Sequence, residues 1–172
     1  IKYRLLIEIE YFIALSEYTL PQLENFDKKH YRALRDIYRK FSIDDAYKVK
    51  EIEKITNHDV KAVEYFLKEK FEELNISESK EFIHFGLTSQ DINNTATPFL
   101  LQQFTNDIYN PIFDKVIQKL YHIASEWADI PMLARTHGQP ASPTRLGKEI
   151  EVFIERLKKQ IGLLRLIPFS AK

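Results

Sequence analysis

Three short polar segments of this sequence contain the residue types that could do chemistry, and each of them holds a histidine. They are Thr56-Asn57-His58-Asp59, His84-Phe85-Gly86-Leu87-Thr88-Ser89-Gln90-Asp91 and Arg135-Thr136-His137-Gly138-Gln139-Pro140-Ala141-Ser142-Pro143. Imidazole is the usual proton carrier near neutral pH, whereas hydroxyl groups and backbone N–H groups can hold a carboxylate or a phosphate. The residue types therefore suit proton transfer and anion binding.

The first segment lies directly before an amphipathic helix. A helix N-terminus offers unpaired N–H groups and a partial positive charge, which favour anions near Asn57, His58 and Asp59. The alternative is that Asn57 only caps the helix and that His58 is a solvated surface residue.

The second segment places two adjacent hydroxyl residues, Thr88 and Ser89, at an expected helix start after the permissive Gly86. These hydroxyls and the nearby backbone donors could hold a carboxylate or phosphate. The alternative is a capping box in which Thr88 caps the helix and Asp91 is its reciprocal partner.

The third segment places His137 in a predicted loop over residues 130–141, between Thr136 and Gly138. Two prolines stiffen the segment, so the imidazole would have a defined position; a purely structural histidine is the alternative. Metal binding is not expected, because the histidines lack the close spacing of zinc ligands and the chain has no cysteine. No serine lies in a nucleophile-elbow motif either.

Apolar residues at helical spacing predict the elements that position these segments. Helices are expected over residues 1–17, 21–41, 43–56 and 60–74, then a long helix to residue 127 with a kink near 108–111, and a last helix from Pro143, capped by Ser142. No strand pattern is evident. The predicted fold is all-α, with a helical N-terminal domain over residues 1–97 and the start of a central helical bundle over residues 98–172.

The last helix repeats its apolar residues at close to heptad spacing, from Leu146 to Leu164. Such a seam requires neighbouring helices. An antiparallel pair formed with the preceding helix would hide only part of it. We therefore expect partners from other subunits or from further sequence.

Composition excludes several classes of protein. The 172 residues carry 25 basic and 25 acidic side chains, and a net charge of zero argues against a nucleic-acid or membrane-surface binder. No apolar run approaches the roughly 20 residues that cross a bilayer. A cytoplasmic protein is the simplest expectation. Because the chain begins at Ile1 inside a periodic segment, we also expect a piece of a longer chain.

The three segments together resemble the adenylosuccinate lyase family, which belongs to the fumarase/aspartase superfamily of helical lyases. The similar stretches cover residues 56–94 and 135–149 and occur in the family's order. We expect the chain to match the bacterial form from purine biosynthesis. The resemblance implies a homotetramer with active sites shared between chains. It also implies elimination of fumarate from adenylosuccinate and from the succinylaminoimidazole-carboxamide ribotide (SAICAR), without a metal or organic cofactor.

The resemblance also implies roles for individual residues. His137 matches the histidine assigned as proton donor or acceptor, and His58 and His84 are implied to lie near the chemistry. Thr88 and Ser89 match the succinyl-binding pair. The full set of implied substrate-binding residues is Asn57, His58, Asp59, Thr88, Ser89, Thr136 and Gln139.

Some parts of the family's site have no counterpart in this sequence. The mobile loop with the general-base serine is expected beyond Lys172, and an Arg-Tyr pair is expected before Ile1. We therefore expect no turnover by this chain alone. Two alternatives stay open: another superfamily lyase (argininosuccinate lyase, aspartase or fumarase), and a helical assembly module without catalysis.

Overall fold

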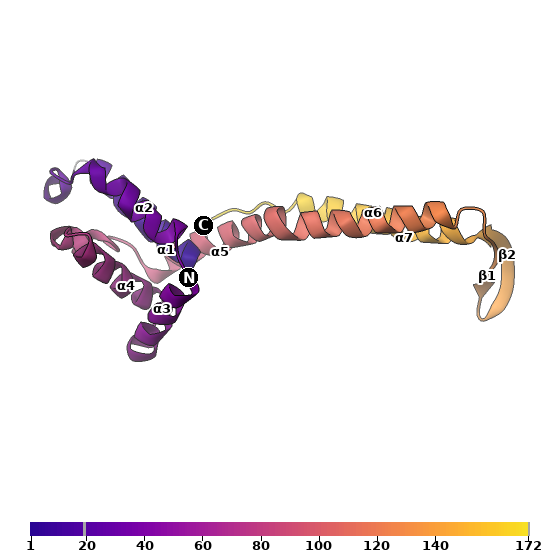
Figure 1. Ribbon diagram of the computed structural model, residues 1–172, viewed down its shortest axis with the longest axis horizontal. Coiled ribbons are helices and arrows are strands. Elements are labelled where there is room, and N and C mark those ends of the chain that lie inside the picture. Colours follow the sequence, from indigo (N-terminus) through magenta and orange to yellow (C-terminus); the bar gives the residue numbers. More distant parts are fainter. Residues whose placement is uncertain (19, 172) are drawn as a thin grey trace. The chain divides into compact units, whose positions relative to one another are not determined.

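The computed structural model describes residues 1–18 and 20–171, most of which lie in helices (Figure 1). The chain divides into two compact units, and each is described by itself. The first contains Ile1–Leu100 and the residues after Phe169, and the second contains Leu101–Phe169. The all-α class predicted from the sequence is confirmed. The one addition in the described residues is a two-stranded hairpin in the second unit.

The first unit is a small helical domain built around α1 and α4. Its elements are α1 (Lys2–Glu17), α2 (Tyr31–Arg39), α3 (Ile43–Thr56), α4 (Asp59–Glu73) and the start of α5 (Ser89–Phe104), with 3₁₀ turns η1 (Pro21–Leu23), η2 (Lys28–His30) and η3 (Ser77–Phe82).

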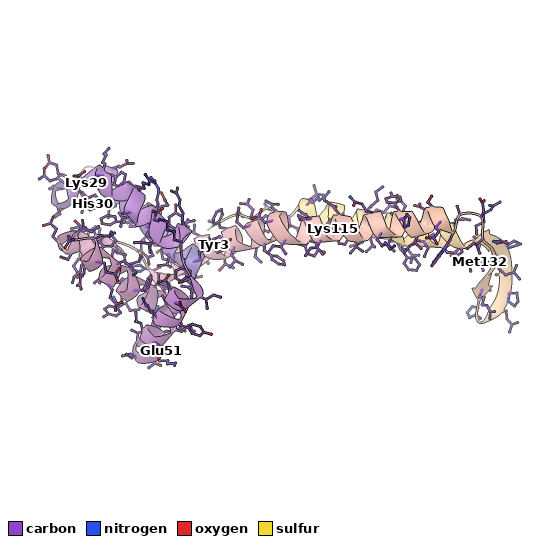
Figure 2. All side chains as sticks on the ribbon, in the orientation of Figure 1. Tyr3, Lys29, His30, Glu51, Lys115 and Met132 are labelled. Atoms are coloured by element: carbon purple, nitrogen blue, oxygen red, sulfur yellow. The ribbon has the colours of Figure 1, made fainter. Side chains whose placement is uncertain are left out.

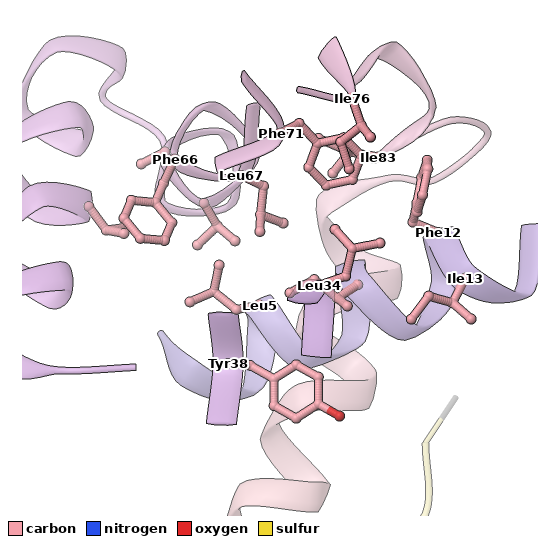
Figure 3. Packing of buried hydrophobic residues seen from close by; sticks show 14 of the residues in the cluster. Leu5, Phe12, Ile13, Leu34, Tyr38, Phe66, Leu67, Phe71, Ile76 and Ile83 are labelled. Atoms are coloured by element: carbon pink, nitrogen blue, oxygen red, sulfur yellow. The ribbon is translucent and has the colours of Figure 1, made fainter. Parts of the chain in front are cut away.

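The core of this unit forms where the apolar stripes of α1 and α4 meet. Leu5 and Phe12 of α1 are fully buried with Leu67 and Phe71 of α4, and Figure 3 shows these side chains in one cluster. The rings of Phe12 and Phe71 meet edge to face with centroids 4.9 Å apart. Such aromatic pairs add to the stabilisation by burial. The helical spacing seen in the sequence thus correctly predicted the apolar stripes, although not which helices pack together.

Helix α3 begins with the capping box predicted from Ser42 and Asp45. The Asp45 N–H donates to Ser42 Oγ at 3.1 Å, and the Ser42 N–H donates to Asp45 Oδ2 at 3.0 Å. Two backbone donors at the helix start are therefore satisfied.

The single helix predicted over residues 21–41 is wrong. Pro21 begins a 3₁₀ turn rather than an α-helix, and the Asp27 side chain accepts from the Lys29 N–H at 2.9 Å to start a second short turn. Side-chain bonds of this kind compete with helix formation. The α-helix begins only at Tyr31.

The second unit is a pair of long helices joined by a β-hairpin. Its elements are the end of α5, a π-helical segment η4 (Thr105–Tyr109), α6 (Asn110–Glu126), β1 (Pro131–Thr136), β2 (Gln139–Arg145) and α7 (Leu146–Arg165). Helices α6 and α7 run side by side (Figure 1). Pro111 lacks the N–H that would continue the α-helical bonds, which accounts for the irregular segment just before it.

The hairpin corrects the predicted loop over residues 130–141. β1 pairs with β2 in antiparallel register, from Pro131 opposite Arg145 to Thr136 opposite Gln139. Ser142 therefore does not cap α7, and Pro143 does not begin it; both lie in β2. Proline is tolerated because each strand of a two-stranded ribbon is an edge strand.

The α6–α7 pair leaves many large apolar side chains uncovered, as the heptad seam predicted. Ile154 and Ile161 of α7 are buried, whereas Phe153 is 55% exposed and Ile112 of α6 is 57% exposed. Figure 2 shows side chains projecting outward along both helices.

Candidate functional site

Helix α1 joins the first polar segment to the second. One guanidinium nitrogen of Arg4, Nη2, lies 2.6 Å from Asp59 Oδ2, and Arg4 Nε donates to Asn93 Oδ1 at 2.8 Å. Asp59 opens α4 and Asn93 lies in the first turns of α5. A single side chain therefore links the first segment to the helix that begins within the second segment.

One turn further along α1, Glu8 contacts the histidine of the second segment. Glu8 Oε1 lies 2.7 Å from His84 Nδ1, and the Glu8 side chain is fully buried. Burial raises the pKa of Glu8 to about 8, with a further contribution from the negative charge of Glu64. Burial also lowers the pKa of His84 below its ordinary value. Both groups are therefore biased toward their neutral forms.

His58 of the first segment lies within electrostatic reach of His84 and caps α4. Its Nδ1 accepts from the Lys61 N–H at 3.2 Å, which leaves the proton of a neutral ring on Nε2. Asn57 adopts a left-handed backbone conformation, with φ 50°, at the C-terminus of α3. The alternative in which Asn57 caps α4 is therefore wrong.

The Thr88 hydroxyl of the second segment is engaged within its own turn. The hydroxyl and the backbone N–H of Thr88 both donate to Asp91 Oδ2, each at 2.7 Å, which lowers the pKa of the Asp91 carboxyl. Ser89 is the first residue of α5, and its hydroxyl makes no hydrogen bond within the part of the chain that the structure describes. Ser89 is therefore the freer of the two hydroxyl donors.

The third segment forms the tip of the hairpin in the second unit. Thr136 and Gln139 face each other as the last pair of the ribbon, and His137 and Gly138 make the turn with φ 51° and 76°. Positive φ at both central residues is typical of a type I′ turn. His137 is exposed at this tip. Positive φ is uncommon for a residue other than glycine, and such positions cluster at functional sites.

The sequence-predicted residues of the first two segments all lie in the first unit, and the structure brings His58 and His84 within electrostatic reach of each other. Those of the third segment gather on the hairpin of the second unit. Sequence reasoning missed Arg4 and Glu8. A signal was present, because Glu8 is a charged residue within the apolar stripe of α1 that includes Leu5, Ile9 and Phe12.

Two features are absent from the described residues, 1–18 and 20–171. They contain no group of three or more His, Asp or Glu side chains placed to hold a metal ion. No helix among them combines the length and apolar character needed to traverse a bilayer.

Comparison with known proteins identifies the family. A family model described as "Lyase" matches residues 13–168, which is most of the chain. The chain belongs to this lyase family. The prediction of a lyase family from the three segments is thereby confirmed.

Several curated relatives of this lyase-family chain are named adenylosuccinate lyase. The protein from Dictyostelium discoideum is 53% identical, and the alignment covers 100% of this chain and 38% of that protein. The proteins from Legionella pneumophila strain Corby and Escherichia coli K12 are 43% and 37% identical and are likewise covered over 38% of their length. The chain thus spans well under half the length of these relatives.

Solved structures share the fold of this chain at lower sequence identity. A fumarate lyase from Mesorhizobium sp. BNC1 matches with a TM-score of 0.68 and 20% identity, over 94% of this chain and 36% of that one. A 3-carboxy-cis,cis-muconate lactonizing enzyme from Pseudomonas putida matches with a TM-score of 0.69 and 18% identity, over 95% and 36%. These matches support the helical fold.

Replacing Arg4 by Met tests the link between the first two segments. We expect the free energy of unfolding of the chain to fall by about 1 kcal/mol, since two partly exposed charge-assisted hydrogen bonds are lost. Urea denaturation measures this change. Arg32→Met, at an exposed position of α2, is the matched control. Equal effects of the two substitutions would show that the Arg4 bonds contribute nothing.

Proposed function

We propose that this chain is part of a cytoplasmic adenylosuccinate lyase. The proposed reaction is the elimination of fumarate from adenylosuccinate to give AMP, and from SAICAR to give the aminoimidazole-carboxamide ribotide (AICAR). The observation that carries the proposal is the 53% identity to an enzyme of that name across the whole chain. The polar segments support it, because they supply imidazoles, hydroxyls and amides suited to a substrate with two carboxylates and a phosphate.

The proposed chemistry is a β-elimination that breaks a carbon–nitrogen bond. A base removes the proton next to a carboxylate, the electron pair forms the double bond of fumarate, and an acid protonates the departing nitrogen. Negative charge builds up at that carboxylate in the transition state, so fixed donors there accelerate the reaction. No metal or organic cofactor is required by this scheme.

The proposed roles are those that the resemblance to the family implies. His137, at the hairpin tip, exchanges the proton with the substrate, and Thr136 and Gln139 beside it orient the substrate. Ser89 donates to a succinyl carboxylate, and Thr88, the other member of the proposed succinyl-binding pair, would do so only after its hydroxyl leaves Asp91. The nucleotide part of the substrate binds at Asn57, His58 and Asp59, and His84 completes the site near the chemistry.

We further propose that the α6–α7 pair assembles with copies of itself into a homotetramer with shared sites. Both helices expose large apolar side chains, with Phe153 55% and Leu163 58% exposed on α7 and Val116 47% exposed on α6. Exposed apolar surface of this kind marks an interaction face. A bundle of helices from several chains would cover it.

Removing one of these exposed apolar side chains tests the proposed assembly. Phe153→Ser is expected to raise the dissociation constant of the oligomer roughly tenfold or more, because aromatic side chains dominate the stability of interfaces. Sedimentation equilibrium over a range of protein concentrations measures the constant. Lys159→Ser, at another exposed position of α7, is the control. Identical constants for both variants and the parent would place the interface elsewhere.

The reaction itself is tested by measuring fumarate release from a full-length enzyme that contains these 172 residues. Adenylosuccinate and SAICAR are expected to be turned over, whereas argininosuccinate, aspartate and malate are not. The 172-residue chain serves as the inactive background. Turnover of argininosuccinate, aspartate or malate instead would assign another superfamily lyase, and no turnover of any substrate would favour the assembly module without catalysis.

A further inference from the structure

The contact between Glu8 and His84 has two features that a simple surface ion pair lacks. Glu8 is 0% exposed, and its second oxygen, Oε2, has no hydrogen-bond partner among the residues that the structure describes. Its first oxygen lies 2.7 Å from His84 Nδ1. An ionised carboxylate would leave half of its charge buried and unpaired, which is costly.

The charged groups around this pair do not offset the cost of burying a negative charge on Glu8. The positive charge of Lys61 of α4 lowers the pKa of Glu8, but Lys61 Nζ donates to Glu64 Oε2 at 2.7 Å. Glu64 itself acts in the opposite direction. Around His84, Glu64 and Asp91 raise its pKa, whereas Lys61 and His58 lower it, so the charge effects oppose one another. Burial is the largest influence on both partners and favours their neutral forms.

The position of the shared proton follows from the unpaired oxygen. A protonated carboxyl with its O–H at Oε2 would bury an unsatisfied donor, whereas an O–H at Oε1 points to His84 Nδ1 and leaves only a carbonyl oxygen unpaired. Buried carbonyl oxygens without a partner are tolerated better than buried donors. His84 Nδ1 must then be the acceptor, and the ring proton must lie on Nε2.

We propose that Glu8 is a positioning residue for His84: its neutral carboxyl group donates to Nδ1 and holds the imidazole as the Nε2–H tautomer. Among the described residues His84 Nε2 has no hydrogen-bond partner, and it is not one of the buried unpaired atoms. The pair therefore presents an N–H donor to an anionic group of a ligand. That ligand is the carboxylate-bearing substrate only if the proposed function holds, whereas the tautomer itself does not depend on it.

The tautomer is measured directly by NMR of the 172-residue chain labelled with ¹⁵N in its histidines. At pH 7 we expect one protonated ring nitrogen, Nε2, and one unprotonated nitrogen, Nδ1, for His84. Glu8→Gln should preserve this pattern, since a glutamine amide can also donate to Nδ1. Glu8→Leu should lose it and give a ring that exchanges between tautomers. Glu10→Gln, at a partly buried glutamate of the same helix that bonds Arg35, should leave His84 unchanged.

The pH dependence of stability gives a second readout. It does not need the Glu8→Leu variant, so it can be measured even if that variant folds poorly. Glu8, whose pKa is raised to about 8 in the folded chain, keeps a proton there that the unfolded chain has already lost. The contribution of Glu8 to the free energy of unfolding therefore falls as pH rises from about 5 to 8. Glu8→Gln cannot lose that proton. Its stability relative to the parent should therefore grow across this window.

An Nδ1–H tautomer or a doubly protonated His84 at pH 7 would overturn the proposal, as would a stability difference between parent and Glu8→Gln that does not change with pH. Neither readout uses enzymatic activity. A confirmed tautomer together with an enzyme that releases no fumarate would therefore count against the proposed function alone.

Discussion

Replacing His137 by Asn is expected to lower the turnover number of the full-length enzyme by roughly 10²–10⁴-fold, the contribution of a positioned proton-transfer group. Asparagine is chosen because it tolerates the positive φ of this turn, which alanine does not. The hairpin should therefore keep its shape while it loses the imidazole. Steady-state fumarate release and urea denaturation are measured on the same preparations.

His122→Asn is the matched control for the His137 substitution. His122 is an exposed histidine of α6 near Glu126, with 3.9 Å between His122 Nε2 and Glu126 Oε2. It belongs to no polar segment with a proposed role. The control should retain the parental turnover number. Loss of stability in step with loss of activity for His137→Asn would favour a structural histidine instead.

Replacing Gly147 by Ala is expected to destabilise the α6–α7 pair by roughly 3 kcal/mol, the upper range for overpacking. A methyl group at this position would overlap the carbonyl oxygen of Ala124 and lie 2.9 Å from the Cα and N of Ala128. These are backbone atoms of the end of α6 and the turn after it, so they cannot rotate away. The Gly147 N–H also donates to the Trp127 carbonyl at 3.0 Å, which holds the start of α7 close.

Gly162→Ala provides the contrast on the same helix. A methyl group there meets nothing within 4 Å, and alanine is the better helix former by about 1 kcal/mol. This variant should be as stable as the parent or slightly more so, as measured by urea denaturation. Comparable destabilisation by both substitutions would show that close backbone contact at Gly147 is not the reason for the glycine.

Much of the fold was predictable because amphipathic helices leave a regular trace in the sequence. Val63, Leu67 and Phe71 follow the helical period and are all buried in α4. The capping box at Ser42 was also visible, since it depends on two residues three positions apart. The incomplete burial of α7 followed from its heptad seam, of which a single partner helix hides only a part. The domain boundary at residue 97 stays a prediction.

The hairpin was not predictable by the same reasoning. Pro140 and Pro143 argue against a strand in the interior of a sheet, and the short alternation of partly buried residues, Met132 and Ala134, is easily missed. The sequence His137-Gly138 was the available signal, since both residues can adopt the positive φ of a two-residue turn. The break in the predicted helix over residues 21–41 depends on local bonds of Asp27, which periodicity does not reveal.

The residue types of the site were predictable, but the residues of α1 that contact them were not. The three histidines stood out because helical packing does not require them in short polar segments. Arg4 and Glu8 belong to the site because they contact Asp59, Asn93 and His84, and these contacts are visible only in the structure. Contacts between residues so distant in the sequence produce no local sequence pattern from which they could be predicted.

The shared active site is tested most directly by mixing two inactive full-length enzymes, one with His137→Asn and one with Ser89→Ala, under conditions in which subunits exchange. If a site takes residue 89 from one chain and residue 137 from another, some sites of the hybrids hold neither defect, and fumarate release from adenylosuccinate should rise well above that of either variant. Activity no greater than that of the two variants alone, after exchange has been verified, would contradict the account.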